Sequence, residues 1–138
     1  MEQKDKELLL KDICGRLPYD IKCKIEIWIG CDVCTIYNIN SIGYVEIVED
    51  SDTNGISIEK IKPYLYPLSS MTEEQKREYE VTLVYHDYTK GGWTIAKTFN
   101  DEYVIPYWFV DFCNKNHFDY RGLIPMGLAK DATGLNIY

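Results

Sequence analysis

Long apolar runs are absent from this chain of 138 residues, and so are the marks of a secreted protein. No stretch approaches the roughly 18 consecutive apolar residues of a membrane-spanning helix, so we expect no membrane association. The amino end is charged, and its apolar stretch, Leu8–Leu10, is far too short for the core of a signal peptide. These absences predict a cytoplasmic protein.

Positive charge is also scarce in this sequence. It has 15 Lys and Arg residues against 22 Asp and Glu residues, which gives a net charge of −7. Proteins that bind the phosphate backbone of nucleic acids need clustered basic residues, so nucleic-acid binding is the least expected function. An acidic surface fits solubility alone, or a basic protein partner, and solubility is the simpler explanation.

The sequence has few closely spaced residues that could bind a metal ion. Five cysteines in a chain without a signal peptide indicate reduced thiols. Cys31 and Cys34 form one C-x-x-C pair, but a tetrahedral zinc site needs a second close pair, which the other Cys and His residues do not form. A redox pair would precede a helix, whereas residues 35–39 are typical of a strand. We interpret the pair as part of a β-turn region and expect no metal and no cofactor, although the sequence alone leaves a metal at Cys31 and Cys34 open.

What the sequence does have is a succession of helical and strand patterns that suits a single domain, residues 1–138. Residues 3–14 show helical apolar periodicity, and Gly15 is expected to end that helix. Period-two alternation or β-rich composition predicts strands over residues 20–30, 33–39, 43–48 and 56–58. We therefore expect an α+β fold in which about residues 20–61 form a small SH3-like barrel, or a bent antiparallel barrel or meander, with flanking helices.

The first predicted strand has the clearest alternation in the chain. The residues that share its expected buried face are Ile21, Cys23, Ile25, Ile27 and Ile29. Trp28 falls on the opposite face, together with charged residues.

The second half is expected to contain a helix, a hairpin, another helix and a docked carboxyl-terminal tail. Ser70 and Glu73 match a capping box, which predicts a short polar helix that starts at Ser70. Residues 79–99 alternate around a glycine turn and predict a β-hairpin, and residues 106–116 predict a helix. Residues 117–138 are rich in apolar and aromatic side chains, which is typical of a folded terminus rather than a free tail.

Tyrosine is unusually frequent, with 12 residues, and the predicted barrel suggests a use for it. SH3-like barrels hold peptides on aromatic rims. The candidate rim residues are Trp28, Tyr37, Tyr44, Tyr64 and Tyr66. The alternative, which we favour slightly, is that the helices and the tail cover these rings.

A second candidate site lies at the start of the tail. Arg121 has the geometry to clamp a carboxylate or a phosphate, with His117 and Asp119 beside it. Arg121 could equally bond Asp119, Asp131 or carbonyls at a helix end, and this structural role is favoured.

A cysteine nucleophile is a weaker candidate. Cys113 and His117 are four residues apart, which brings them together if helical geometry reaches His117. No glycine-rich turn accompanies Cys113, which lies in an aromatic run, so a core cysteine is the favoured interpretation.

Three parts of the chain together resemble known sequences. They are Glu7–Tyr19 (E-L-L-L-K-D-I-C-G-R-L-P-Y), Lys62–Glu74 (K-P-Y-L-Y-P-L-S-S-M-T-E-E), and Asn116–Ile124 (N-H-F-D-Y-R-G-L-I) with the end Asp131–Tyr138 (D-A-T-G-L-N-I-Y). In these parts the chain resembles an uncharacterised family of small proteins carried by gut Bacteroidetes and by their phages and mobile elements. The resemblance implies a bacterial cytoplasm and an accessory role in a phage or mobile element. It implies no activity and no functional residue.

These observations favour a non-enzymatic, intracellular module that binds another protein and modulates host machinery. The alternative is a binder of a small anionic, nucleotide-like ligand, or an enzyme, that uses the His117–Arg121 region. The sequence leaves the identity of the partner, the oligomeric state and any catalytic role open.

Overall fold

The computed structural model of the chain describes residues 1–28, 32–49, 55–77 and 107–138. The helices and strands are α1 (Gln3–Arg16), β1 (Ile21–Ile25), β2 (Cys34–Ile39), β3 (Val45–Ile47), β4 (Ile61–Leu65), α3 (Tyr107–Lys115) and β5 (Lys130–Asp131). Three 3-10 turns lie between them, at Leu17–Tyr19, Ile58–Lys60 and Leu68–Ser70. The predicted α+β class is confirmed. In the described ranges, none of the helices has the length and apolarity to cross a bilayer.

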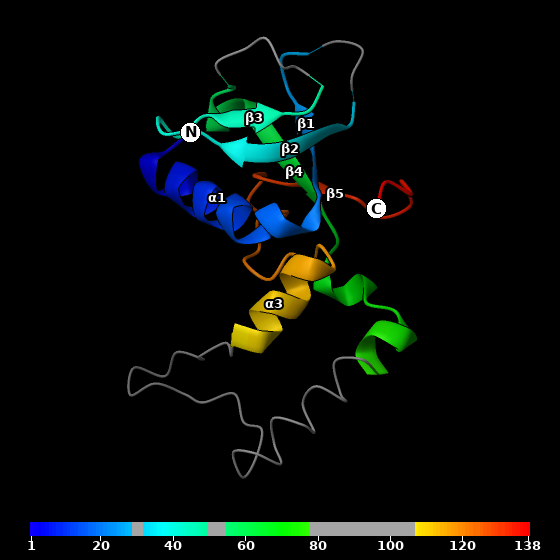
Figure 1. The fold of residues 1–138 in the computed structure, drawn as a ribbon. Helices are drawn as coiled ribbons and strands as arrows, with labels where there is room; N and C mark the ends of the chain where they lie inside the picture. Colours follow the sequence, from blue (N-terminus) through cyan, green and yellow to red (C-terminus); the bar gives the residue numbers. More distant parts are fainter. Residues whose placement is uncertain (29–31, 50–54, 78–106) are drawn as a thin grey trace, which may run out of the picture.

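The strands form one five-stranded sheet in the order β3-β2-β1-β4-β5 (Figure 1). Neighbouring strands are antiparallel, except that β5 runs parallel to β4. At the centre, Cys23 of β1 lies opposite Cys34 of β2 on one side and Pro63 of β4 on the other. The described sheet is therefore mixed and open, whereas the sequence predicted only antiparallel strands. A two-residue strand such as β5 has no alternation from which it could be predicted.

A short segment leads from the outer side of β3 to β4, on the other side of the antiparallel strands. Ile56 pairs with Val45 on the outer side of β3, in an isolated antiparallel bridge. The 3-10 turn Ile58–Lys60 follows at once, and β4 then pairs with β1 on the opposite side of the ladder. The expected strand over residues 56–58 is therefore reduced to a single bridge, because the backbone turns at Ile58.

Helix α1 covers one face of the sheet, and α3 lies on the side of α1 that faces away from the sheet (Figure 1). Leu9 and Ile13 of α1 are fully buried among the sheet residues. The sheet residues that complete this core are Ile21, Cys23, Ile25, Cys34, Ile36, Val45, Ile47, Ile61 and Leu65. The predicted alternation in β1 is confirmed as far as Ile25, but Ile27 is 60% exposed because the strand ends before it. Ile29 lies outside the described residues.

Gly15 does not end α1, contrary to the prediction. The helix continues to Arg16, and Leu17–Tyr19 adds a 3-10 turn before Asp20 leaves the helical path at φ 60°. A Cβ atom added at Gly15 would lie 3.3 Å from the Asn114 side chain of α3. The glycine therefore serves the close approach of the two helices rather than a helix stop.

The second helix also begins later than predicted, at residue 73 instead of Ser70. The Ser70 hydroxyl donates to the Pro67 carbonyl inside the preceding 3-10 turn, so it is not available as a helix cap. Thr72 and Gln75 form the capping box instead, with hydrogen bonds of 3.1 and 2.9 Å. The predicted hairpin over residues 79–99 lies outside the described residues, and α3 matches the predicted third helix.

The carboxyl-terminal segment is attached to the sheet at several points. β5 pairs with Tyr64 and Leu65, and the Ala132 amide donates to the Leu65 carbonyl at 2.8 Å. At the end of the segment, the Tyr138 hydroxyl donates to the Tyr64 carbonyl at 2.8 Å and accepts from the Lys22 amide at 3.0 Å. These contacts bring the last residues of the chain beside the segment that follows α3.

Candidate functional site

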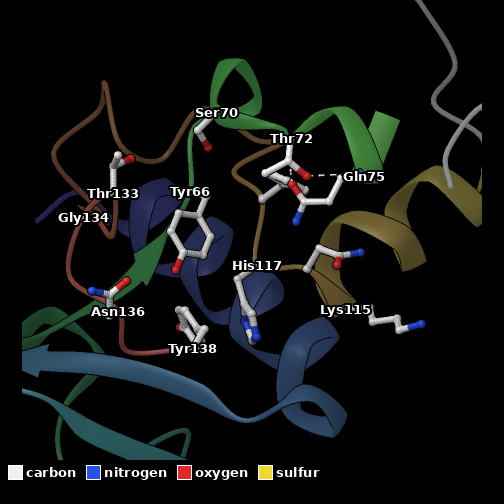
Figure 2. A pocket seen from close by; sticks show the side chains of 12 residues that line it. Tyr66, Ser70, Thr72, Gln75, Lys115, His117, Thr133, Gly134, Asn136 and Tyr138 are labelled. Carbon is white, nitrogen blue, oxygen red and sulfur yellow. Dashed lines mark hydrogen bonds between the residues drawn. The ribbon is translucent and has the colours of Figure 1, made fainter. Parts of the chain in front are cut away.

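A cavity of about 520 Å³ lies where the segment after β4, the loop after α3 and the carboxyl-terminal tail meet (Figure 2). We call it the His117 groove. Aromatic rings and uncharged hydrogen-bonding side chains dominate its lining. The lining residues are Tyr66, Ser70, Thr72, Gln75, Lys115, Asn116, His117, Phe118, Thr133, Gly134, Asn136 and Tyr138.

Backbone hydrogen bonds hold the walls of the groove together. The Tyr66 amide donates to the His117 carbonyl, and the Asp119 amide donates to the Tyr66 carbonyl, both at 2.8 Å. His117 itself adopts a left-handed conformation, with φ 62°, directly after α3. This turn ends the helical path, so the imidazole faces Tyr138 rather than lying along α3 (Figure 2).

Three rings form a corner of the groove. The His117 and Tyr138 rings are stacked, with centroids 3.6 Å apart and planes 14° apart. The Tyr66 ring meets Tyr138 edge-on at 5.9 Å. Because the hydroxyl of Tyr138 is bonded to the backbone of Lys22 and Tyr64, its ring is fixed in place. The corner is therefore preorganised for a further planar group.

His117 is neutral at physiological pH. Its side chain is only 9% exposed, and burial, with a smaller effect of the positive charge of Arg16, lowers the pKa of His117 from 6.5 to about 4. Its Nδ1 atom is buried and has no hydrogen-bond partner among the residues that the structure describes. A buried polar atom in this state leaves about 1–3 kcal/mol to be recovered by any group that reaches it.

The described lining holds few groups that could take part in a reaction. Among the described residues, neither a side-chain carboxylate nor a thiol lines the groove. Cys113, the nearest nucleophile candidate in sequence, is fully buried, and burial raises the pKa of its thiol to about 12. A thiol in that state is not a nucleophile at neutral pH. The neutral imidazole of His117 can donate or accept a hydrogen bond, and the other described polar groups of the lining are hydroxyls, amides and the Lys115 amine.

The structure places Arg121 and Asp119 outside the groove lining. The Arg121 Nε donates to Asp12 at 3.2 Å, and Asp12 also holds Arg16 through two hydrogen bonds of 2.8 and 3.2 Å. Arg16 donates further to the Phe118 carbonyl at 2.7 Å, and both guanidinium groups lie about 5 Å from the Tyr120 ring centroid. We call Asp12, Arg16, Tyr120 and Arg121 the charged cluster.

The Asp119 side chain bonds to the backbone of nearby residues. Its two carboxylate oxygens accept from the backbone amides of Leu123 and Ile124, at 2.8 and 2.9 Å. The side chain is 7% exposed. Asp119 thus closes the turn that starts the tail, and the predicted grouping of His117, Asp119 and Arg121 is divided between the groove, the turn and the charged cluster.

The predicted aromatic rim is divided as well. Tyr64 is buried and donates to the Asp32 carbonyl at 2.8 Å, while Trp28 is half-buried against the core. Tyr37 and Tyr44 are 53% and 41% exposed. Tyr44 lines a second hollow of about 390 Å³ beside α1, and only Tyr66 of this set enters the His117 groove.

The cysteines of the described segments lie apart from the groove. Cys34 is buried in β2 opposite Cys23, and Cys31 lies outside the described residues. Within the parts of the chain that the structure describes, no three His, Cys, Asp or Glu side chains are grouped to hold a metal ion.

Sequence reasoning missed Tyr138, Asn116 and Asn136 as site residues. Tyr138 had one signal, since it ends a tail whose apolar content predicted docking. The two asparagines had none, because their role depends on which segments the tertiary structure brings together. No protein-family model, curated protein or solved structure matches this chain.

Proposed function

We propose that this protein is a non-enzymatic binding module that holds a segment of another protein in the His117 groove. One observation carries the proposal: a preorganised corner of rings contains a neutral, buried imidazole with an unpartnered nitrogen. Aromatic rings with polar tips are the side chains that protein interfaces use most. Polar atoms of the groove that can still form hydrogen bonds fix the orientation of a bound group, which ring stacking alone does not do.

The charge of the groove supports a protein segment over an anionic ligand. Lys115 is the one cationic residue in the lining described here, and it already has an interaction of its own. Arg121, the expected anion clamp, is bonded to Asp12. Anion sites normally combine several free donors with positive charge.

The alternative, a small ligand near His117–Arg121, has one supporting observation, which is the volume of the groove. A cavity of about 520 Å³ falls within the roughly 300–1,000 Å³ of small-molecule sites. Thermal stabilisation of the protein by millimolar ATP, but not by adenosine, would favour the anionic version of this alternative. Equal lack of effect by both would remove it.

For the fold we propose an SH3-like barrel over about residues 20–61, extended by β4 to residue 65. The support is the path of the chain: β1, β2 and β3 form an antiparallel meander, Ile56 adds a bridge beyond β3, and β4 returns to β1 after a 3-10 turn. A fold of this kind offers loop and rim surfaces for peptides.

For the setting we propose a bacterial cytoplasm, with the protein acting as a phage or mobile-element accessory factor on host machinery. The resemblance of the two ends and of residues 62–74 to a family of that origin supports this setting. The acidic net charge of −7 is compatible with a basic partner.

The test compares two positions of the same kind. A photoreactive amino acid is placed at Thr133, in the groove, or at Asn38, exposed on β2, and a bacterial lysate is irradiated. The partner that cross-links at position 133 is purified, and its affinity is measured for Thr133→Lys and Asn38→Lys. We expect the first substitution to weaken binding by about tenfold or more and the second to change it by less than about twofold. Equal cross-linking at both positions, or unchanged affinity for Thr133→Lys, would contradict the proposal.

A further inference from the structure

We infer that the His117 groove selects an uncharged aromatic group that carries a hydroxyl, which in a protein partner is an unmodified tyrosine side chain. This inference rests on the proposed function and deepens it, because it specifies what the bound segment must present. Three features of the groove lead to it: its rings, its open hydrogen-bonding groups and its small number of charged side chains.

The rings favour an aromatic ligand over an aliphatic one. His117 and Tyr138 are stacked at 3.6 Å, and Tyr66 stands edge-on to Tyr138 at 5.9 Å. A planar group that enters this corner can stack on one ring and meet another edge-on. Each such aromatic pair strengthens binding beyond the effect of the area that it buries.

The open hydrogen-bonding groups favour a hydroxyl on that ring. The Nδ1 atom of His117 is buried and has no partner in the described segments, and its ring is neutral. The Tyr66 hydroxyl has no hydrogen bond to any residue that the structure describes, and Figure 2 shows it directed toward Tyr138. A neutral imidazole and a phenol can each donate or accept, so the matching group is one that does both, and a hydroxyl does so by rotating.

The charge of the groove disfavours a charged version of the same ligand. Within the described lining there is no side-chain carboxylate that would hold a cation, and Lys115 is the one basic residue. A phosphate on the ring would bring about two negative charges into a site with a single basic side chain. Phosphorylation of the partner tyrosine is therefore expected to prevent binding.

The experiment uses the full chain and small probes in place of the partner. Two-dimensional NMR spectra are recorded during titration with N-acetyl-tyrosinamide, N-acetyl-phenylalaninamide, the O-phosphorylated tyrosine compound and adenosine. We expect saturable shifts of the His117, Asn136 and Tyr138 signals with N-acetyl-tyrosinamide, with a Kd on the order of millimolar. Its binding should be about three- to tenfold tighter than that of the phenylalanine compound, because one hydrogen bond distinguishes them.

A matched pair of variants tests the role of the hydroxyl on the protein. Tyr66→Phe removes one oxygen from the groove, whereas Tyr37→Phe removes one from the exposed face of β2. We expect Tyr66→Phe to reduce the preference for tyrosine over phenylalanine, because only His117 then remains to bond the hydroxyl, and Tyr37→Phe to retain it in full. The dispersion of the amide spectrum shows that each variant is folded.

Several results would overturn the inference: equal affinity for the tyrosine and phenylalanine compounds, tighter binding of the phosphorylated compound, preferred binding of adenosine, or no saturable shift. If a partner cross-links at position 133 while the probes show no tyrosine preference, the inference fails and the proposed function stands. If N-acetyl-tyrosinamide binds as expected while no protein cross-links at position 133, the proposed function fails and the ligand class stands.

Discussion

The charged cluster and the His117 groove both include residues of the segment 117–121, but they differ in how their polar groups are bonded. In the charged cluster, Asp12 accepts from both Arg16 and Arg121, and Arg16 donates its remaining bonds to the carbonyls of residues 113 and 118. In the His117 groove, the Nδ1 atom of His117 is buried, and none of the described residues forms a hydrogen bond with it. The ionised side chains of the cluster are bonded, whereas the buried atoms without a partner among the described residues belong to neutral groups: His117, Asn114 and the Tyr120 hydroxyl of the cluster itself.

The physical reason for this difference is the free energy of burying a charge. A buried ion that loses its partner destabilises a protein by about 3–5 kcal/mol, whereas an unpaired neutral polar group costs about 1–3 kcal/mol. Arg16 and Asp12 are fully buried, so neither can be left open for a partner that comes and goes. A neutral imidazole can lack a hydrogen-bond partner, and the protein can still fold when no binding partner is present.

The largest expected effect comes from breaking the charged cluster. Asp12→Asn keeps the shape of the side chain but leaves the buried Arg16 and the half-buried Arg121 facing a neutral amide. We expect the free energy of unfolding, measured with urea, to fall by about 3–5 kcal/mol. The control is Glu2→Gln, which removes a solvent-exposed ion pair with Lys4 and should leave the urea midpoint unchanged. Equal midpoints for Asp12→Asn and wild type would show that the cluster does not hold the fold.

The next effect is a pH dependence from His117. Its pKa is about 4 in the folded protein and 6.5 as a model value, so the unfolded state binds the proton more readily between these pH values. The neutral imidazole therefore contributes full stability above pH 6.5, and that contribution is lost as the pH falls toward 4. The shift corresponds to about 3 kcal/mol.

The test of this pH dependence is His117→Asn, since asparagine tolerates the left-handed backbone at φ 62°. The groups whose charges act on the imidazole, Arg16, Asp20 and Lys22, remain in place. Unfolding free energies are measured from pH 7 to pH 4 for both proteins. The variant should lose less stability than wild type over this interval. Parallel curves would mean that the imidazole is not buried as a neutral group.

A smaller effect is expected at the carboxyl-terminal anchor. Tyr138→Phe leaves the Lys22 amide without its acceptor and removes a donor from the Tyr64 carbonyl. We expect a loss of about 1–2 kcal/mol and faster amide exchange at residues 130–138. Tyr44→Phe, at a tyrosine that is 41% exposed, should change stability by less than about 0.5 kcal/mol. Unaltered exchange in Tyr138→Phe would show that the hydroxyl does not anchor the tail.

The smallest effect sharpens the distinction between the two regions. Arg121→Lys keeps the positive charge near Asp12 but loses the planar contact with Tyr120. We expect a loss of about 1 kcal/mol in unfolding free energy and no change in the binding of N-acetyl-tyrosinamide. A fall in probe affinity would favour the other role considered for Arg121, that of a ligand-binding residue.

Much of the fold could be predicted because it depends on local patterns. The period-two alternation of Ile21, Cys23 and Ile25 predicted the buried face of β1, and the helical pattern of residues 3–14 predicted α1. The predictions that were wrong concern ends of elements. Gly15 lies inside α1, and Ile27 lies beyond the end of β1. Contacts from other segments decide such boundaries, and a local pattern does not include them.

The candidate site was predicted less well. His117 and Tyr66 were named as ligand-binding residues and line the groove, while Arg121 and Asp119 were named with them and make bonds elsewhere. A sequence shows that an arginine and an aspartate are near each other, but not which buried group competes for them. Asp12 is that competitor, more than a hundred residues away from Arg121 in the sequence.

The sequence by itself determined the α+β class, the inner face of β1 and the apolar character of the carboxyl-terminal tail, because these follow from the spacing of apolar side chains along the chain. Only the tertiary structure decided that Asp12 would pair with Arg16 and Arg121, and that Tyr138 would stack on His117. The reason is that burial and pairing belong to residues brought together from distant segments. A buried polar side chain stabilises the fold when another segment provides its hydrogen-bond partner, and it can bind a ligand when no segment does.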